Sequence, residues 1–93
     1  MSFELGFLEK ALKEWGKLDR NTREQFKAKL AERLSNPHVP SAKLSGHKDR
    51  YKIKLRSVGY RLVYEVRASE LIVVVVAVGK RERIAVYKAA VKR

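Results

Sequence analysis

Residues 50–64 have the sequence Arg-Tyr-Lys-Ile-Lys-Leu-Arg-Ser-Val-Gly-Tyr-Arg-Leu-Val-Tyr, and this stretch predicts a β-hairpin. Charged and apolar residues alternate strictly from Arg50 to Leu55. Because successive side chains of a strand point to opposite faces, the alternation separates an apolar face from a cationic face. The apolar face holds Tyr51, Ile53 and Leu55, and the other face holds Arg50, Lys52, Lys54 and Arg56. The break at residues 57–59 then turns the chain into a second strand.

The cationic face of this hairpin predicts an anionic partner. No acidic residue occurs between Asp49 and Glu65, and Arg61 adds a further cation on the returning strand. Like charges placed side by side on a strand repel one another and bring no packing benefit. We therefore expect this face to bind a polyanion.

Composition indicates which polyanion to expect. The chain has 93 residues, 45% of them hydrophobic, and a formal net charge of +12, which together predict a single domain over residues 1–93. The positive charge is uneven, because segments 50–64 and 80–93 together hold eleven Lys and Arg residues against one acid, Glu82. Nucleic acid is the leading ligand class, followed by an acidic protein or an anionic membrane.

Several function classes are disfavoured by what the sequence lacks. Cysteine is absent, which removes disulfides, thiolate nucleophiles and cysteine-based zinc sites and fits a reducing cytoplasm. The first seven residues do not resemble a signal peptide, and the apolar run 73–78 is too short to cross a bilayer. There is no glycine-rich phosphate loop and no metal-ligand spacing. We expect a cytoplasmic protein with no membrane contact, no cofactor and no metal.

The rest of the chain predicts an α+β domain around the hairpin. Alternation predicts a first strand over 2–7, and apolar spacings of three and four predict two helices that form a helical hairpin packed on a sheet. Asp19 or Asn21 caps the second helix, and Ser35-Asn36-Pro37 ends it. An irregular connection follows over 37–49, and residues 71–78 predict a central strand buried on both faces. With a final helix, the order is β-α-α-β-β-β-α in a small, mainly antiparallel sheet.

The cationic hairpin also suggests a chemistry. RNA is cleaved without a metal when a base activates the 2′-hydroxyl, cations stabilise the phosphorane and an acid protonates the departing 5′ oxygen. Lys52 and Lys54 lie two residues apart among other cations, which is the crowding that lowers a lysine pKa enough for it to act as a base. Arg61 and Arg81 would bind the scissile phosphate, and Tyr87 would stack on a base or orient the phosphate.

Other readings of the same residues remain open. The charge pattern fits a basic docking face as well as a nuclease, since it does not distinguish holding RNA from cutting it. His38 and His47 lie in the predicted loop without a partner motif, so we expect solvated side chains there. Glu65 is expected in a surface ion pair. The remaining aromatic side chains are expected in the core or at the sheet edge, namely Trp15, Tyr51, Tyr60 and Tyr64.

Four motifs, taken in order, resemble the RelE toxins of bacterial toxin–antitoxin systems. The motifs are Ala11-Leu12-Lys13-Glu14-Trp15, Tyr51-Lys52-Ile53-Lys54-Leu55-Arg56-Ser57, Gly59-Tyr60-Arg61-Leu62-Val63-Tyr64 and Val78-Gly79-Lys80-Arg81-Glu82-Arg83. The resemblance runs over essentially the whole chain. It implies a small antiparallel sheet with a helical hairpin and a C-terminal helix, in agreement with the predicted element order.

The resemblance also implies an activity and its residues. It implies an endoribonuclease that acts on the mRNA codon in the A site of the 70S ribosome, needs no metal and leaves a 2′,3′-cyclic phosphate. The catalytic set that it implies is Lys52, Lys54, Arg61, Arg81 and Tyr87. In this set Lys52 and Lys54 activate the 2′-hydroxyl and stabilise the phosphate, Arg61 contacts the transition state, Arg81 is the general acid and Tyr87 stacks on the mRNA. The surrounding cations are expected to bind RNA and the ribosome, and these are Arg50, Arg56, Lys80, Arg83 and Lys88.

The resemblance further implies partners and leaves alternatives. A toxin with a charge of +12 is expected to be neutralised by an acidic, RelB-like antitoxin that covers the basic face. Operator DNA would be bound only by the toxin–antitoxin complex. The alternatives are a toxin of the same fold that acts on DNA gyrase and a non-catalytic module that binds RNA or the ribosome.

Overall fold

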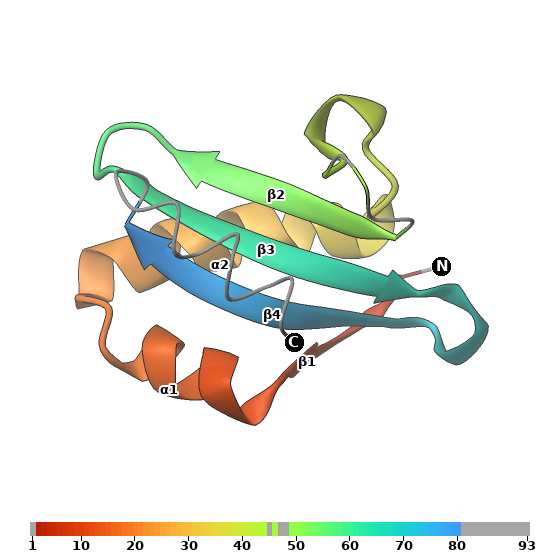
Figure 1. Ribbon diagram of the computed structural model, residues 1–93, viewed down its shortest axis with the longest axis horizontal. Coiled ribbons are helices and arrows are strands. Elements are labelled where there is room, and N and C mark those ends of the chain that lie inside the picture. Colours follow the sequence, from red (N-terminus) through yellow and green to blue (C-terminus); the bar gives the residue numbers. More distant parts are fainter. Residues whose placement is uncertain (1, 45, 47–48, 81–93) are drawn as a thin grey trace.

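The computed structural model describes residues 2–44, 46 and 49–80, and the fold is given for these residues. Their order is β1 (Glu4–Phe7), α1 (Glu9–Gly16), α2 (Arg20–Ser35), β2 (Arg50–Leu55), β3 (Tyr60–Arg67) and β4 (Ile72–Lys80), with short 3₁₀ turns at Pro40–Ala42 and Ala68–Glu70. The strands form one sheet in the order β1-β4-β3-β2 (Figure 1). β1 pairs with β4 in parallel, and the other two pairings are antiparallel.

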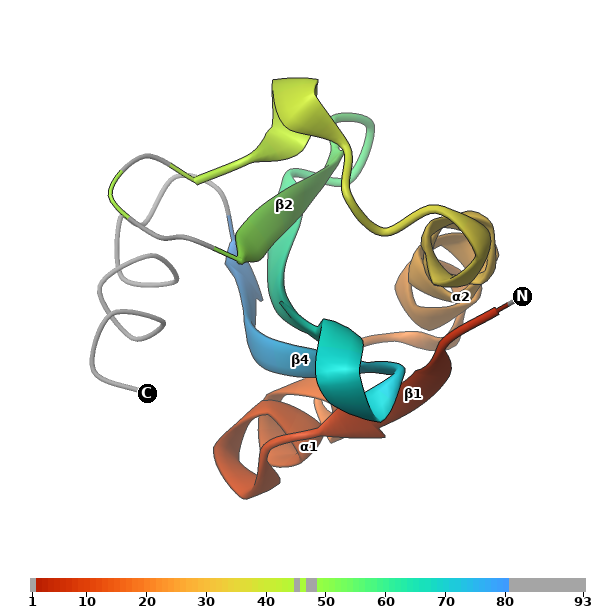
Figure 2. The same cartoon turned by 90° about the vertical axis from the view of Figure 1, so that its right-hand side faces the viewer.

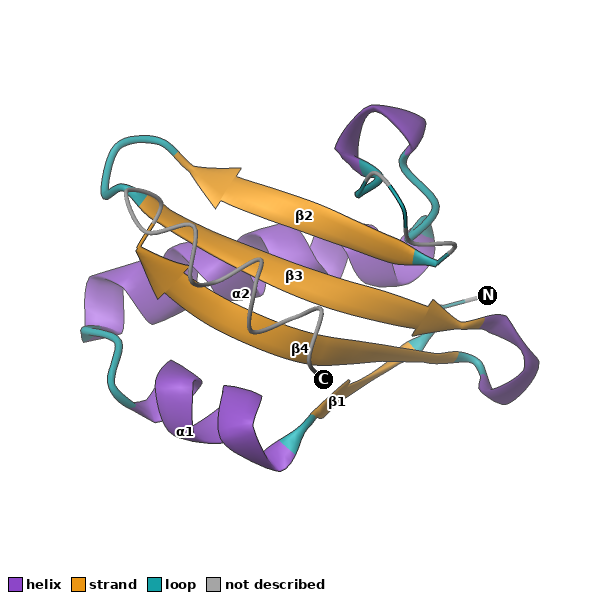
Figure 3. Ribbon diagram, viewed as in Figure 1, coloured by secondary structure: helices purple, strands orange, loops and turns teal. Residues whose placement is uncertain are grey.

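The α+β class, the element order as far as β4 and the mainly antiparallel sheet are as predicted. The predicted C-terminal helix lies outside the described residues. Figure 3 shows the three antiparallel strands β2, β3 and β4 side by side, with both helices flanking the sheet. Several boundaries differ from the prediction. β1 begins at Glu4 rather than at residue 2, and β4 continues to Lys80 rather than ending at Val78. Leu71 is not part of β4, because its backbone is left-handed (φ 55°) and ends the turn before the strand. Arg56 lies in the turn after β2 rather than on the strand.

Helix α2 covers one face of the sheet (Figure 2). It starts at Asp19, whose carboxylate accepts hydrogen bonds from both the backbone N–H and the hydroxyl of Thr22, and these bonds lower the pKa of Asp19. Phe26 and Leu30 are fully buried against the sheet, as their spacing predicts. The main core lies here, between the helices and the apolar faces of β2, β3 and β4.

Helix α1 continues the edge of the sheet where β1 ends. The Leu8 N–H donates to Val75 O at 3.0 Å, and the Val78 N–H donates to Glu14 Oε1 at 3.2 Å. Trp15 packs against Phe7 and Phe26, so it is a core residue as expected. The helix thus covers the part of β4 that the short strand β1 does not reach.

A β-bulge in β4 changes which of its residues face the helices. Tyr64 pairs with Val75 and Val63 pairs with Ala77, which leaves Val76 as an extra residue. Before the bulge the odd-numbered residues of β4 join the main core, and after it Val78 does. Ala77 therefore lies with Val63 on the opposite face.

Candidate nucleic-acid interface

The face of the sheet away from the main core carries the predicted lysines. Lys52 pairs with Val63, and Lys54 pairs with Arg61. Directly paired residues project from the same face with Cβ atoms about 5 Å apart, so Lys54 and Arg61 are immediate neighbours. On the other side of Arg61 lies Gly79 of β4, which presents no side chain. The hairpin therefore brings three predicted site residues, Lys52, Lys54 and Arg61, onto one face of the sheet.

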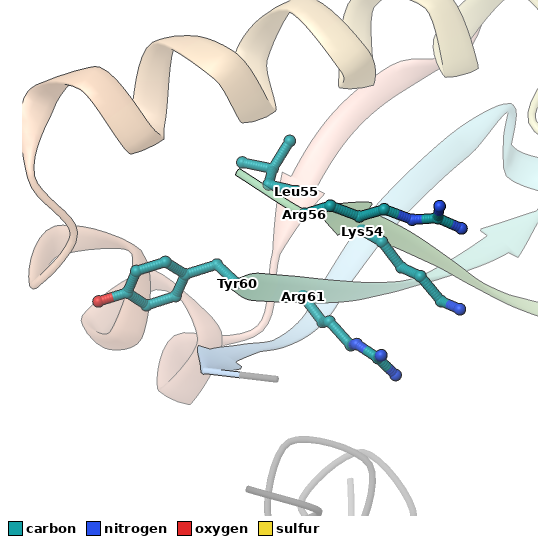
Figure 4. A pocket seen from close by; sticks show the side chains of 5 residues that line it. All are labelled: Lys54, Leu55, Arg56, Tyr60 and Arg61. Carbon is teal, nitrogen blue, oxygen red and sulfur yellow. The ribbon is translucent and has the colours of Figure 1, made fainter. Parts of the chain in front are cut away.

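A pocket of about 280 Å³ opens at the end of this hairpin (Figure 4). Its lining residues are Lys54, Leu55, Arg56, Tyr60 and Arg61. In Figure 4 the side chains of Lys54 and Arg61 extend to the same side of the sheet, while Tyr60 points the other way. Three of the five lining side chains are cationic, so the pocket suits an anionic group such as a phosphate.

The crowding of cations changes the chemistry of Lys54. The pKa of Lys54 is lowered, first by the charge of Lys52, then by that of Arg61, by partial burial and by Arg56. A lower pKa increases the fraction of neutral amine, which is the form that can accept a proton. A lysine that acts as a base needs such a lowered pKa.

Arg50 has an anionic neighbour on this face. Its Nε lies 3.1 Å from Glu65 Oε1, and Arg67 Nε lies 2.9 Å from Glu65 Oε2. Burial alone would raise the pKa of Glu65, but the hydrogen bonds from Arg67 and Arg50 outweigh it and lower that pKa. The ion pair predicted for Glu65 is confirmed. Glu65 lies directly across the hairpin from Arg50, so one of the four cations of this face is paired within the chain.

Lys80 is not part of this cluster. Lys80 pairs with Tyr60, so its side chain leaves the sheet on the face opposite to Arg61. The remaining predicted residues lie outside the described part of the chain, namely Arg81, Arg83, Tyr87 and Lys88.

His38 does not join the lysines. The ring of His38 makes edge contacts with Tyr51 at 5.9 Å and with Phe3 at 6.5 Å, on the face opposite to Lys52. His47 lies outside the described residues. Among the residues that the structure describes there is no group of three His, Cys, Asp or Glu side chains placed to hold a metal ion. No helix in the same part of the chain is long and apolar enough to cross a membrane.

Sequence reasoning missed one residue near the hairpin. Arg33 of α2 donates through Nη1 to the Tyr64 hydroxyl at 2.9 Å and contacts Lys52 O at 3.4 Å. The sequence shows Arg33 only as one of many alternating charges on a helix. Its position directly before Leu34, on the border of the apolar seam, is the one signal that it approaches the sheet.

Known proteins resemble this chain over its full length. The family model for the ParE toxin of the parDE type II toxin–antitoxin system matches residues 5–85. The mRNA interferase toxin RelE of Escherichia coli K12 is 56% identical, with 100% of this chain and 98% of the relative covered. A solved structure of an E. coli RelE variant in the free state superposes with a TM-score of 0.93 at 54% identity, covering 100% of this chain and 98% of that one. The variant bound to a peptide of the antitoxin RelB gives 0.85 at the same identity and coverage. The chain belongs to the RelE/ParE family of toxins of type II toxin–antitoxin systems.

Proposed function

We propose that this protein is a toxin that cleaves mRNA in the ribosomal A site and so stops translation. The observation that carries the proposal is the placement of Lys54 beside Arg61, with Lys52 one pleat away on the same face. This arrangement supplies a lysine of lowered pKa next to a guanidinium that can bind a phosphate in a bidentate manner. The relatives named mRNA interferases support RNA, rather than DNA gyrase, as the target.

The proposed reaction is an attack of the 2′-hydroxyl on the adjacent phosphorus. The neutral amine of Lys54 takes the hydroxyl proton, and the ammonium of Lys52 and the guanidinium of Arg61 stabilise the negative charge on the phosphorane. The bond from phosphorus to the 5′ oxygen breaks, and that oxygen leaves with a proton. The products are a 2′,3′-cyclic phosphate and a 5′-hydroxyl end.

Arg81 and Tyr87 complete the proposed site. Tyr87 would stack on the mRNA, and Arg81 would protonate the leaving oxygen. An ordinary guanidinium is a weak acid, so Arg81 needs a test of its own. A substrate with sulfur in place of the 5′ oxygen has a leaving group that needs no proton. If Arg81 is the acid, this substrate restores cleavage by Arg81→Ala. If the loss persists, Arg81 only stabilises charge.

The ribosome has a defined part in this proposal. In the part of the chain that the structure describes, the face of Lys54 and Arg61 offers little means of holding a free strand with the 2′-oxygen in line for attack. The ribosome would supply that alignment, and Arg50, Arg56, Lys80, Arg83 and Lys88 would help to hold the toxin on it. Efficient cleavage of purified RNA without ribosomes would contradict this part of the proposal.

The decisive experiment measures single-turnover cleavage of mRNA on programmed ribosomes. Arg61→Ala is expected to lower the rate roughly 100- to 1,000-fold, as for loss of one transition-state contact, while ribosome affinity changes little. Lys29→Ala removes a cation from the exposed side of α2 and serves as the charge control. Equal losses of rate and affinity in Arg61→Ala would reduce Arg61 to a docking contact. Intact mRNA with the wild-type toxin would refute the nuclease.

Regulation is proposed to come from an acidic, RelB-like antitoxin in the same cytoplasm. Its support is the net charge of +12 and the RelE structures solved with RelB. An equimolar antitoxin is expected to abolish cleavage, and operator DNA is expected to bind the complex but not the toxin alone.

We also propose that residues 1–93 form one domain, for which a single cooperative urea transition is the expected result.

A further inference from the structure

Arg33, near the end of α2, reaches the outer edge of β2. Its Nη1 lies 2.9 Å from the hydroxyl of Tyr64 and 3.4 Å from the carbonyl oxygen of Lys52, and its guanidinium carbon lies 5.8 Å from the centre of the Tyr64 ring. The Tyr64 hydroxyl in turn donates to Pro37 O at 2.8 Å. Together, the bonds of Arg33 and of the Tyr64 hydroxyl link the helix, the loop that follows it and two strands of the hairpin.

The contact with Lys52 falls where β2 has no neighbouring strand. β2 is an edge strand, and the carbonyl groups of Arg50 and Lys52 point outward because they are two residues apart. Arg50 O accepts from the Leu44 N–H at 2.9 Å, and Lys52 O is met by Arg33. Two successive outward carbonyl groups of β2 are thus hydrogen-bonded, and the next residue whose carbonyl points outward is Lys54.

The hairpin needs such anchoring because of its charge. Lys54 faces Arg61 directly and has Lys52 and Arg56 nearby, so the cations repel one another across and along the two strands. Repulsion favours any movement of the edge strand that separates them. The ladder with β3 opposes this movement from one side of β2, and a hydrogen bond to the outer side of β2 opposes it from the other.

We infer that Arg33 is a positioning residue for the cleavage reaction, which fixes the backbone of β2 at Lys52 and so keeps Lys52 and Lys54 close to Arg61. It acts from the core side of the sheet, behind the face that would meet RNA, and it need not touch the substrate. The inference rests on the proposed function only for its effect on cleavage. Its effect on the geometry of the lysines concerns the free toxin.

The free toxin allows a test without ribosomes. NMR titration of the lysine side chains is compared in wild type, Arg33→Lys, Arg33→Ala and Lys29→Ala. In Arg33→Lys the charge is kept but the planar guanidinium is lost, so a change there reports geometry rather than electrostatics. We expect the pKa of Lys54 to rise toward its ordinary value in both Arg33 variants and to stay unchanged in Lys29→Ala. An unaltered Lys54 titration in folded Arg33→Lys would overturn the inference.

The second test of the inference measures mRNA cleavage on the ribosome. Arg33→Ala is expected to lower the single-turnover rate roughly 10- to 100-fold at unchanged ribosome affinity, and Arg33→Lys is expected to restore part of that loss. An equal loss in Lys29→Ala, or a wild-type rate in Arg33→Ala, would contradict a positioning role. If the wild-type toxin itself fails to cleave, the proposed function falls, while the titration still decides whether Arg33 holds the lysines.

Discussion

Removing one oxygen, in Tyr64→Phe, tests whether the hydrogen bonds behind the hairpin hold it in place. Tyr64 is completely buried, and burial raises the pKa of its hydroxyl, so this group keeps its proton at neutral pH. The hydroxyl donates to Pro37 O and accepts from Arg33 Nη1. The substitution removes both bonds and leaves the Pro37 carbonyl oxygen with one donor, the Val39 N–H at 3.1 Å, in place of two.

The expected loss follows from the kinds of bond involved. A hydrogen bond between neutral groups contributes about 0.5–1.5 kcal/mol, and one to a charged group about 1.5–3 kcal/mol. Since Arg33 is only half-buried and can regain water, we expect a loss of about 2–4 kcal/mol in the free energy of unfolding. For a domain of this size that corresponds to a fall in Tm of roughly 10–20 °C.

Urea unfolding measures this loss, and Tyr51→Phe provides the control. The ring of Tyr51 stacks on that of Tyr64 at 5.6 Å, is also buried, and has no hydrogen bond from its hydroxyl to another described residue. The same chemical change there is expected to cost no more than about 0.5 kcal/mol. A shift of the urea midpoint at constant m-value would mark a true loss of stability. If Tyr64→Phe loses no more than Tyr51→Phe, the bonds to Arg33 and Pro37 do not hold the hairpin.

Three further substitutions test the hairpin itself. Lys52→Ala removes the largest cause of the lowered pKa of Lys54, so the rise of the cleavage rate with pH is expected to move to higher pH; an unmoved profile would argue against Lys54 as the base. Glu65→Gln is expected to cost about 1–2 kcal/mol at pH 7. Because the folded pKa of Glu65 is lowered, this difference should be present above its ordinary value of 4.5 and disappear as pH falls through the folded value, which urea titrations at several pH values would show. Gly59→Ala places a side chain at φ 71° and should cost about 1 kcal/mol in urea unfolding, whereas Ser57→Ala in the same turn should cost less.

The sequence predicts the sheet well because its strands carry period-two patterns. Alternation from Arg50 to Leu55 places Tyr51 in the core and Lys54 on the open face, as the structure confirms. The mostly β-branched run 71–78 predicts a central strand, and β4 indeed lies between β1 and β3. Local pattern suffices here because each strand is specified by its own residues.

Contacts between distant segments are what the sequence does not reveal. The Arg33 side chain meets Tyr64, 31 residues later, and the Glu14 carboxylate caps a backbone group of Val78, 64 residues later. Both residues lie on helices where many other charges are merely exposed. No spacing rule separates the arginine that reaches an edge strand from its solvated neighbours, because the difference arises from how the helix is placed on the sheet.

The bulge at Val76 is another feature that the sequence does not reveal, and it decides which residue of β4 lies beside Arg61. Without the extra residue, strict alternation in β4 would continue the odd-numbered core positions of Val73 and Val75 into Ala77 and Gly79. Val78 would then stand beside Arg61 on the cationic face, and a branched side chain would crowd the guanidinium. The bulge instead places Gly79 next to Arg61. The pairing of Arg61 with a residue that has no side chain thus depends on one irregular residue, which a period-two pattern cannot predict because the bulge is its exception.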